Sequence, residues 1–160
     1  MRVPKLIRIL LLGFVFLSLG FIRDFLFLNV NEQTRIAYYH SSDSQLAPSL
    51  HFLTAYSYSK LYYLKWALTF VFSVIYMGLS VGIVKVLFAG KKYLRWTVFA
   101  YTFLIILAGI FWYGGYLAGH SENGYLISRF LMGMAQGPVV LMVLVPAFKL
   151  MDVHSIDQKT

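Results

Sequence analysis

Arg23 and Asp24 stand side by side in the apolar stretch FIRDFLFL, where a charged side chain is costly unless it is paired or reaches water. A guanidinium group can bind phosphate or carboxylate through two parallel hydrogen bonds, and a neighbouring carboxylate can orient the bound group or accept a proton. Lys65 and Arg129 lie near the ends of two other apolar stretches. These four residues are therefore the candidate site for an anion or a lipid headgroup.

Three interpretations of these charges are open at this point. The basic side chains could extend toward water and lipid phosphate, which requires no specific function. Asp24 could instead pair with Arg129 or Lys65 between helices, and Arg23 would then face a different neighbour, because consecutive helical residues point about 100° apart. In the third interpretation, the basic groups hold the phosphate of a lipid or a lipid-linked substrate, and Asp24 orients it or accepts a proton.

Other residues of chemical interest are few. The sequence has no cysteine, which excludes thiol nucleophiles, cysteine-ligated zinc and iron–sulfur clusters. His40, His51 and His120 are not at ligand spacing on one helix, so no metal site is predicted. The sequence also contains no phosphate-binding glycine loop and no nucleophile elbow. We therefore expect no catalytic residues and no cofactor, and a non-enzymatic function is favoured over an enzymatic one.

The composition predicts the elements that carry these residues. Hydrophobic residues make up 59% of the 160-residue chain and charged residues only 12%, whereas a soluble domain has about 25% charged residues. Apolar runs long enough to cross a bilayer cover residues 6–28, 61–88, 95–117 and 125–150, and such runs must form helices in lipid. We predict an all-α, polytopic membrane protein in which residues 1–160 form one integral membrane domain, a four-transmembrane-helix bundle.

The distribution of basic residues predicts the orientation. Nine of the 14 Lys and Arg residues fall at one set of span ends: Arg2, Lys5, Arg8, Lys85, Lys91, Lys92, Arg95, Lys149 and Lys159. Basic residues concentrate on the cytoplasmic side, so both termini are predicted to be cytoplasmic and the number of spans to be even. The first run lacks a small-x-small cleavage site, which indicates a retained signal anchor. The membrane is predicted to be of the cytoplasmic type, an inner or plasma membrane. Because the basic residues border apolar runs and form no soluble basic face, no nucleic-acid partner is expected.

Residues 31–60 form the only substantial loop, which is predicted to face outward. Apolar residues recur at helical spacing in its second half: Leu46, Leu50, Leu53 and Tyr56. They fit a short interfacial helix with Pro48 in its first turn, although an irregular loop fits this short stretch equally well. Nine of the 12 tyrosines lie in the outer half or the outer loops: Tyr38, Tyr39, Tyr56, Tyr58, Tyr62, Tyr63, Tyr113, Tyr116 and Tyr125. They form either an aromatic belt at the membrane interface or a binding surface.

Small and polar residues predict where the helices pack. Glycines four residues apart would let helix backbones approach closely: Gly78 with Gly82, Gly115 with Gly119, and Gly133 with Gly137. Polar residues follow one face of the second span, which should point into the bundle or toward a partner protein: Lys65, Thr69, Ser73, Tyr76 and Ser80.

The fourth span contains two prolines, Pro138 and Pro146, which cannot donate backbone hydrogen bonds. The helix should therefore bend there, either as a static kink or as a hinge. Gln136 lies close enough to bond a carbonyl that a proline leaves free, or to reach across to Ser73 in the second span.

The leading hypothesis is a small non-enzymatic integral membrane protein that acts as an accessory or assembly subunit of a larger membrane complex. It would recognise other integral membrane proteins through its helix faces and its tyrosine-rich outer loop, in contact with membrane lipids. The main alternative is a lipid-handling or lipid-linked-substrate-handling protein, an enzyme or transporter, with an outer-leaflet site at Arg23, Asp24, Lys65 and Arg129. A small transporter working as a homodimer would instead need a polar route along the stripe of the second span.

Overall fold

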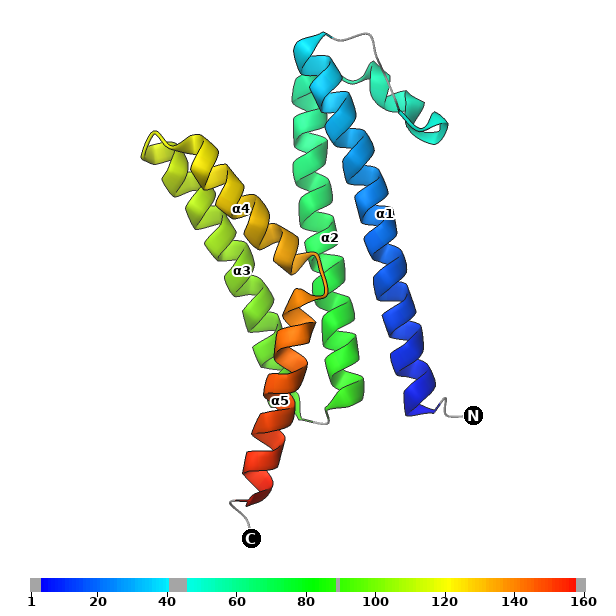
Figure 1. Ribbon diagram of the computed structural model, residues 1–160, viewed down its shortest axis with the longest axis vertical. Coiled ribbons are helices and arrows are strands. Elements are labelled where there is room, and N and C mark those ends of the chain that lie inside the picture. The colour runs from blue at the N-terminus through cyan, green and yellow to red at the C-terminus, as the bar shows by residue number, and fades with distance from the viewer. Residues whose placement is uncertain (1–3, 41–45, 89, 158–160) are drawn as a thin grey trace. The chain divides into compact units, whose positions relative to one another are not determined.

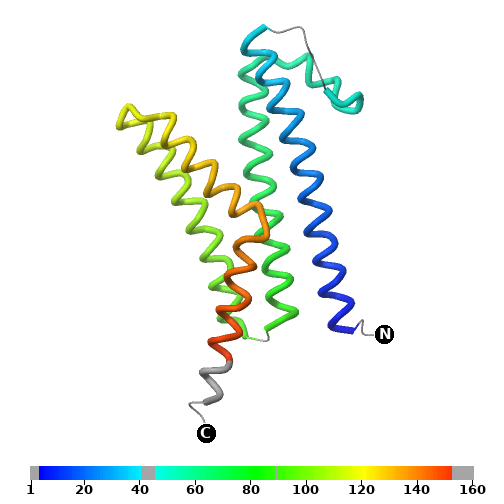
Figure 2. The backbone as a smooth tube through the Cα atoms, viewed as in Figure 1, coloured from blue at the N-terminus to red at the C-terminus, as the bar shows by residue number. Residues whose placement is uncertain are grey.

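The computed structural model describes residues 4–40, 46–88 and 90–157, and all regular structure in these ranges is helical (Figure 1). The elements are α1 (Lys5–Tyr39), the 3₁₀ helix η1 (Pro48–Ala55), α2 (Tyr58–Leu87), α3 (Lys91–Leu117), α4 (Ser121–Ala135) and α5 (Val139–Asp157). Figure 2 follows the backbone through them in this order. The predicted all-α class is therefore confirmed. Arg2 and Lys159, two of the basic residues used to predict the orientation, lie outside the described ranges.

The helices α1, α2 and α3 are each long and apolar enough to cross a membrane. The predicted fourth span is instead two helices, α4 and α5, which could form one span only as a pair bent by 57°. These apolar helices indicate an integral membrane protein, and the four-span bundle stays a prediction.

The first helix continues well past the predicted end of the first span at residue 28. It runs to Tyr39, and polar side chains beyond residue 28 bond within the helix. Thr34 Oγ1 donates to the carbonyl of Val30 at 2.6 Å, and Arg35 donates to both carboxylate oxygens of Glu32 at 2.6 and 3.1 Å. The sequence-based boundary marked the end of the apolar run, but an i,i+3 ion pair such as Glu32–Arg35 can support a helix beyond it.

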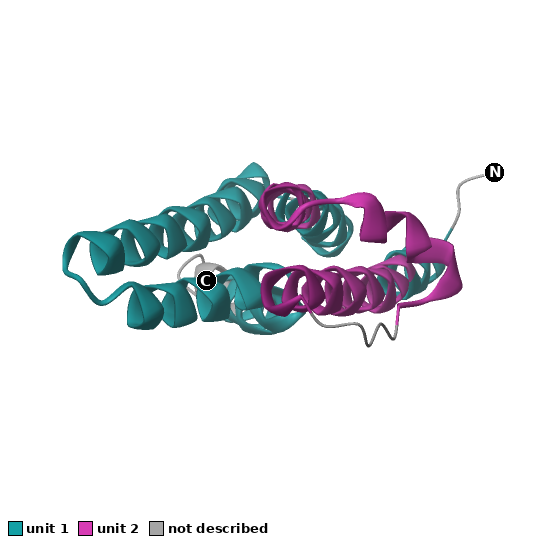
Figure 3. Cartoon of the chain, turned by 90° about the horizontal axis from the view of Figure 1, so that it is seen from above, with its two compact units in different colours: residues 1–14, 73–160 teal, residues 15–72 magenta. Residues whose placement is uncertain are grey.

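Chain contacts divide the protein into two compact units, residues 1–14 with 73–160 and residues 15–72 (Figure 3). The core of the second unit packs η1 against α1 and the start of α2. Its buried residues are Val30, Leu50, Leu53 and Leu61. Asn29 ties the chain before η1 to α1, because its Oδ1 accepts a hydrogen bond from the backbone N–H of Ala47 at 2.9 Å.

A short helix in the second half of residues 31–60 was one of the two alternatives that the sequence left open, and the structure has it as η1. Pro48 is its first residue, where a missing N–H costs nothing. Leu50 and Leu53 are buried, and their three-residue spacing matches the period of a 3₁₀ helix. Tyr56 lies after the helix and is exposed. The position of η1 at a membrane interface stays a prediction.

In the unit of residues 1–14 and 73–160, α3 and α4 form a hairpin whose backbones touch (Figure 1). A Cβ placed on Gly115 would lie 2.6 Å from the Cα of Gly124, and one on Gly124 would lie 2.6 Å from the carbonyl oxygen of Phe111. Only glycine fits at such distances. Gly119, in the turn between the two helices, has a φ of 73°, which also favours glycine.

Near the other end of α3, an aromatic core joins α2, α3 and α5. Its buried members are Val84, Tyr93 and Phe148, and the rings of Tyr93 and Phe148 have centroids 4.9 Å apart. The hydroxyl of Tyr93 donates a hydrogen bond to Asp152. This core fixes which face of α3 points inward.

The helical structure is interrupted at residues 136–138, between α4 and α5. The predicted bend is therefore confirmed at Pro138. This proline stands directly before α5, and its carbonyl accepts the amide hydrogen of Met142 at an N–O distance of 2.9 Å. Pro146 lies inside α5, which remains helical through it. Gln136 Nε2 donates to Ser73 Oγ at 3.0 Å, which is one of the two alternatives that the sequence left open. Motion about this break stays a prediction.

The part of the α2 polar stripe from Ser73 onward belongs to the unit of residues 1–14 and 73–160, and it faces inward. Ser73, Tyr76 and Ser80 are almost completely buried, and Ser80 Oγ lies 2.6 Å from the hydroxyl of Tyr101 in α3. Gln136 is buried against the same helix. Ser73, Tyr76, Ser80 and Gln136 are therefore packed inside this unit, and a polar route for a transporter stays a prediction.

We predict that Gly115→Ala lowers the stability of the hairpin by about 1–3 kcal/mol, because the added methyl group forces α3 and α4 apart. The measurement is thermal unfolding of the purified protein in mild detergent. Gly109→Ala is the control, because a Cβ on Gly109 of the same helix meets no described atom within 4 Å. Equal melting temperatures for the two variants would contradict the close contact.

We also predict a favourable coupling between Ser73 and Gln136, measured by a double-mutant cycle of Ser73→Ala and Gln136→Leu. Hydrogen bonds between membrane helices contribute about 0.6 kcal/mol on average and up to about 1.7 kcal/mol. The cycle isolates this one bond from other interactions of the two residues. Additive effects on the unfolding free energy would show that the bond does not stabilise the fold.

Candidate functional site

Arg23 and Asp24 bind each other. The Nε and Nη2 atoms of Arg23 both donate to Oδ1 of Asp24, at 3.0 and 2.7 Å. The two Cβ atoms point in different directions, but the arginine side chain is long enough to fold along the helix and reach its neighbour. Within residues 15–72, Asp24 forms no ion pair with Lys65, which was one of the partners considered from the sequence. The charge of Asp24 is compensated locally.

Lys65 and Arg129 occupy different surroundings. Lys65 is half-buried on α2, where its carbonyl accepts a hydrogen bond from Thr69 Oγ1 at 2.8 Å. Arg129 is exposed on α4 and forms no ion pair with any described residue. Arg23, Asp24 and Lys65 belong to one compact unit and Arg129 to the other. Their convergence on one anion site therefore stays a prediction.

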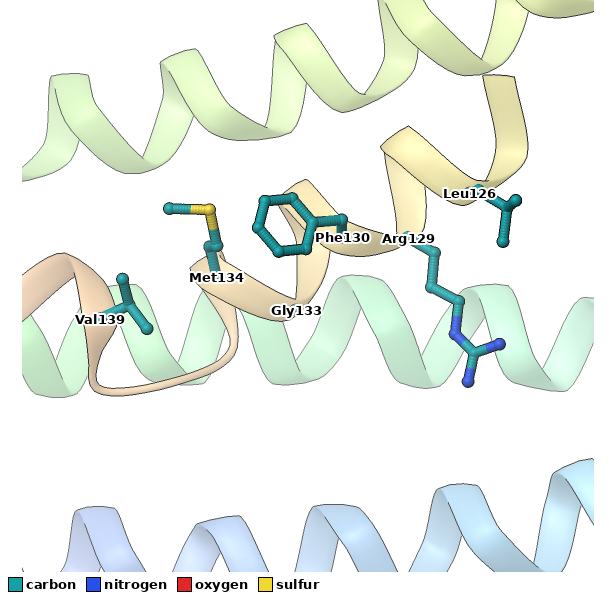
Figure 4. A pocket seen from close by; sticks show the side chains of 6 residues that line it. All are labelled: Leu126, Arg129, Phe130, Gly133, Met134 and Val139. Atoms are coloured by element: carbon teal, nitrogen blue, oxygen red, sulfur yellow. The ribbon is translucent and has the colours of Figure 1, made fainter. Parts of the chain in front are cut away.

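Arg129 lies with Leu126 toward one end of a groove of about 480 Å³ that follows one face of α4 to the break before α5 (Figure 4). The groove is lined by Leu126, Arg129, Phe130, Gly133, Met134 and Val139. The five lining residues on α4 recur every three to four positions, which is the period of a single helix face, and Val139 belongs to α5. We call it the α4 groove.

The α4 groove has an apolar wall and a glycine floor. The Phe130 side chain is 69% exposed, and a Cβ on Gly133 would meet no described atom within 4 Å. In Figure 4 the guanidinium end of Arg129 points away from the ring of Phe130 and the sulfur of Met134. One cation beside apolar side chains can bind and orient a group, but it supplies neither a nucleophile nor a proton acceptor. The groove is thus suited to binding.

The six glycines predicted to pack helices have different surroundings. Gly115 is in close contact, but its partner is Gly124, which the sequence analysis did not single out. A usable signal was present, because Gly115 and Gly124 lie four and five residues on either side of Gly119 in the turn. A Cβ on Gly82 would lie 3.9 Å from Leu12, and one on Gly137 would lie 3.2 Å from the carbonyl of Gly133 in the same segment. Gly78, like Gly133, has no described atom in reach, so contacts of these two glycines with another protein stay a prediction.

A second surface was missed because its three basic residues were used only to predict orientation, and its two aromatic residues were not considered with them. Near the start of α3, a hollow of about 550 Å³ is lined by Lys91, Lys92, Arg95, Trp96 and Phe99. The sequence signal was the spacing KKxxRWxxF, which places cations and aromatic rings on one side of a helix.

Part of the predicted tyrosine surface forms a connected aromatic group in residues 15–72. Tyr38 contacts Tyr39 and Tyr58 with ring centroids 4.9 and 5.4 Å apart, and Tyr62 contacts Tyr58 and Trp66 at 6.4 Å each. The rings of Tyr38 and Tyr39 are mostly exposed. Both the aromatic belt and the binding surface are compatible with this arrangement.

Among the described residues, no group of three or more His, Asp or Glu side chains could hold a metal ion. Comparison of the chain with protein-family models, with curated proteins and with solved structures gives no match. The function must therefore be argued from the surfaces described above.

Proposed function

We propose that this protein is a non-enzymatic accessory or assembly subunit of a larger membrane complex, and that it binds an apolar helix of another integral membrane protein in the α4 groove. In this proposal α4 and α5 together make a bent fourth span of a single membrane domain. Both termini then lie on the cytoplasmic side of an inner or plasma membrane, in agreement with the basic-residue asymmetry.

The observation that carries the proposal is the open glycine floor of the α4 groove. Helices associate in a membrane through close backbone contact, because lipid tails are as apolar as the side chains they would replace. Gly133 offers such a contact and no described part of the chain uses it. Phe130 and Met134 would pack on either side of the incoming helix.

The charge of Arg129 further specifies the partner. Its guanidinium group has no ion pair among the described residues, whereas Arg23 and Arg35 are both paired within α1. An unpaired cation near a membrane favours a carboxylate or phosphate nearby. We therefore propose that the partner helix brings an acidic side chain to the Arg129 end of the groove.

Replacing Gly133 by Leu should fill the floor of the groove and abolish copurification of stoichiometric partners in mild detergent. Abundance and melting temperature should stay close to wild type, since the added side chain enters open space. Gly109→Leu is the matched control, because Gly109 is also open but lies on α3 outside the groove. A wild-type protein that purifies without stoichiometric partners, or a Gly133→Leu variant that keeps them, would argue against the proposal.

The second candidate is a lipid-handling function, which is favoured by Arg129 at the end of an apolar groove. The volume of about 480 Å³ lies within the range of about 300–1,000 Å³ that small-molecule sites occupy. A lipid phosphate would bind the guanidinium group, and an acyl chain would follow the apolar wall.

Arg129→Ala separates the two candidates. If the groove holds a lipid or lipid-linked substrate, this variant should lose the bound species while copurifying proteins remain, as measured by mass spectrometry of extracted lipids and of the protein complex. Arg129→Lys should retain part of the lipid binding, since it keeps the positive charge and loses only the bidentate hydrogen bonding of the guanidinium group. Loss of protein partners with unchanged lipid content would instead support the accessory subunit.

A further inference from the structure

The first two turns of α3 concentrate positive charge next to aromatic rings. Lys91, Lys92 and Arg95 line the hollow of about 550 Å³ together with Trp96 and Phe99. All five side chains are exposed. We call this surface the basic–aromatic groove.

The charge of this surface is not neutralised within the described chain. None of its three cations forms an ion pair with a described carboxylate, and the only other charge-related contact is Lys92 Nζ over the Tyr93 ring at 4.8 Å. The first turn of α3 contains no acidic residue, and Gly90 before it provides no side-chain cap. The positive end of the helix dipole adds to the same field. An anion from outside the chain would be favoured here.

Packing on the opposite side of α3 fixes the direction in which the groove faces. Tyr93, Thr97 and Tyr101 are at most 2% exposed, and Tyr93 is held by Phe148 and Asp152. At about 100° per residue, Arg95 and Phe99 point away from this buried face. The groove is therefore presented outward by a rigid helix.

An apolar stripe continues the groove along the helix. The rings of Trp96 and Phe99 lie 5.8 Å apart, and those of Phe99 and Phe103 stack at 6.2 Å. Ile106 extends the stripe and is 56% exposed. At 1.5 Å per residue, the distance from Arg95 to Ile106 is about 16 Å, close to half of a bilayer core of about 30 Å. The cations and the stripe thus match one leaflet.

We propose that the basic–aromatic groove binds an anionic phospholipid. The headgroup phosphate contacts Lys91, Lys92 and Arg95, and Trp96 lies at the level between headgroup and chains, where tryptophan is favoured. An acyl chain follows Phe99, Phe103 and Ile106. A free phosphate would use only the cations, whereas a phospholipid also covers the exposed stripe.

The test uses Trp96 as a reporter in a Trp66→Phe, Trp112→Phe background, since the chain has three tryptophans. The protein is placed in nanodiscs that contain phosphatidylcholine and phosphatidylglycerol, with bromine atoms on the chains of one lipid or the other. Brominated phosphatidylglycerol should quench Trp96 more strongly than brominated phosphatidylcholine at equal mole fraction. Removing a basic residue should lower the relative affinity for phosphatidylglycerol about fivefold.

The decisive comparison is between two double variants that remove the same charge. Lys91→Gln with Lys92→Gln should abolish most of the preference, whereas Lys85→Gln with Lys149→Gln, at exposed positions outside the groove, should preserve it. Equal quenching by both lipids in the parent, or equal loss in both variants, would overturn the proposal. Binding of inorganic phosphate to the protein, with Trp96 quenched equally by the two brominated lipids, would show an anion site without a lipid site, and would also overturn the proposal. Circular dichroism of each variant confirms that the helices are intact.

Discussion

Polar groups that apolar helices bury must find partners inside the protein, because the core of a bilayer offers them no water. In the unit of residues 1–14 and 73–160, α2 meets this requirement through two bonds, from Ser73 to Gln136 and from Ser80 to Tyr101. The two serines are seven residues apart, which places them two turns apart on one face. The rotation of α2 in this unit is therefore set by polar bonds. Apolar contacts are less selective, since lipid can replace them.

The same requirement identifies the surfaces that depend on something outside the chain. Arg129 and the cations of the basic–aromatic groove have no carboxylate partner among the described residues, although Arg23 and Arg35 both have one. Both surfaces combine unpaired cations with exposed apolar side chains. In the proposals made here, a partner helix completes one surface and a phospholipid completes the other. A buried acceptor, Oε1 of Gln33, also lacks a partner among the described residues.

Sequence patterns predicted a structural feature correctly where that feature depends on a local physical rule. Apolar run length predicted the helical class, proline chemistry predicted the break at Pro138, and the face shared by Ser73 and Ser80 predicted an inward stripe. The sequence did not show that Asp24 would bind Arg23, because that contact depends on the conformation of a long side chain. It also paired Gly115 with Gly119, whereas the contact is with Gly124, because the hairpin geometry was not known. The α4 groove ends at the interruption after Ala135. The sequence did not show this end of α4, because the apolar run continues from α4 into α5.

The length of α1 has a consequence for everything attached to its polar end. A helix of 35 residues is about 52 Å long, whereas a bilayer with its headgroups is about 40–45 Å thick. If α1 crosses the bilayer at the usual modest tilt, its C-terminal end, before Tyr39, extends beyond the lipid headgroups into water. The η1 segment, anchored to this helix through Asn29 and Val30, is then held at a set height. Inserting or deleting one residue in α1 before Asn29 changes the distance of η1 from the membrane by about 1.5 Å. It also rotates η1 about the helix axis by about 100°.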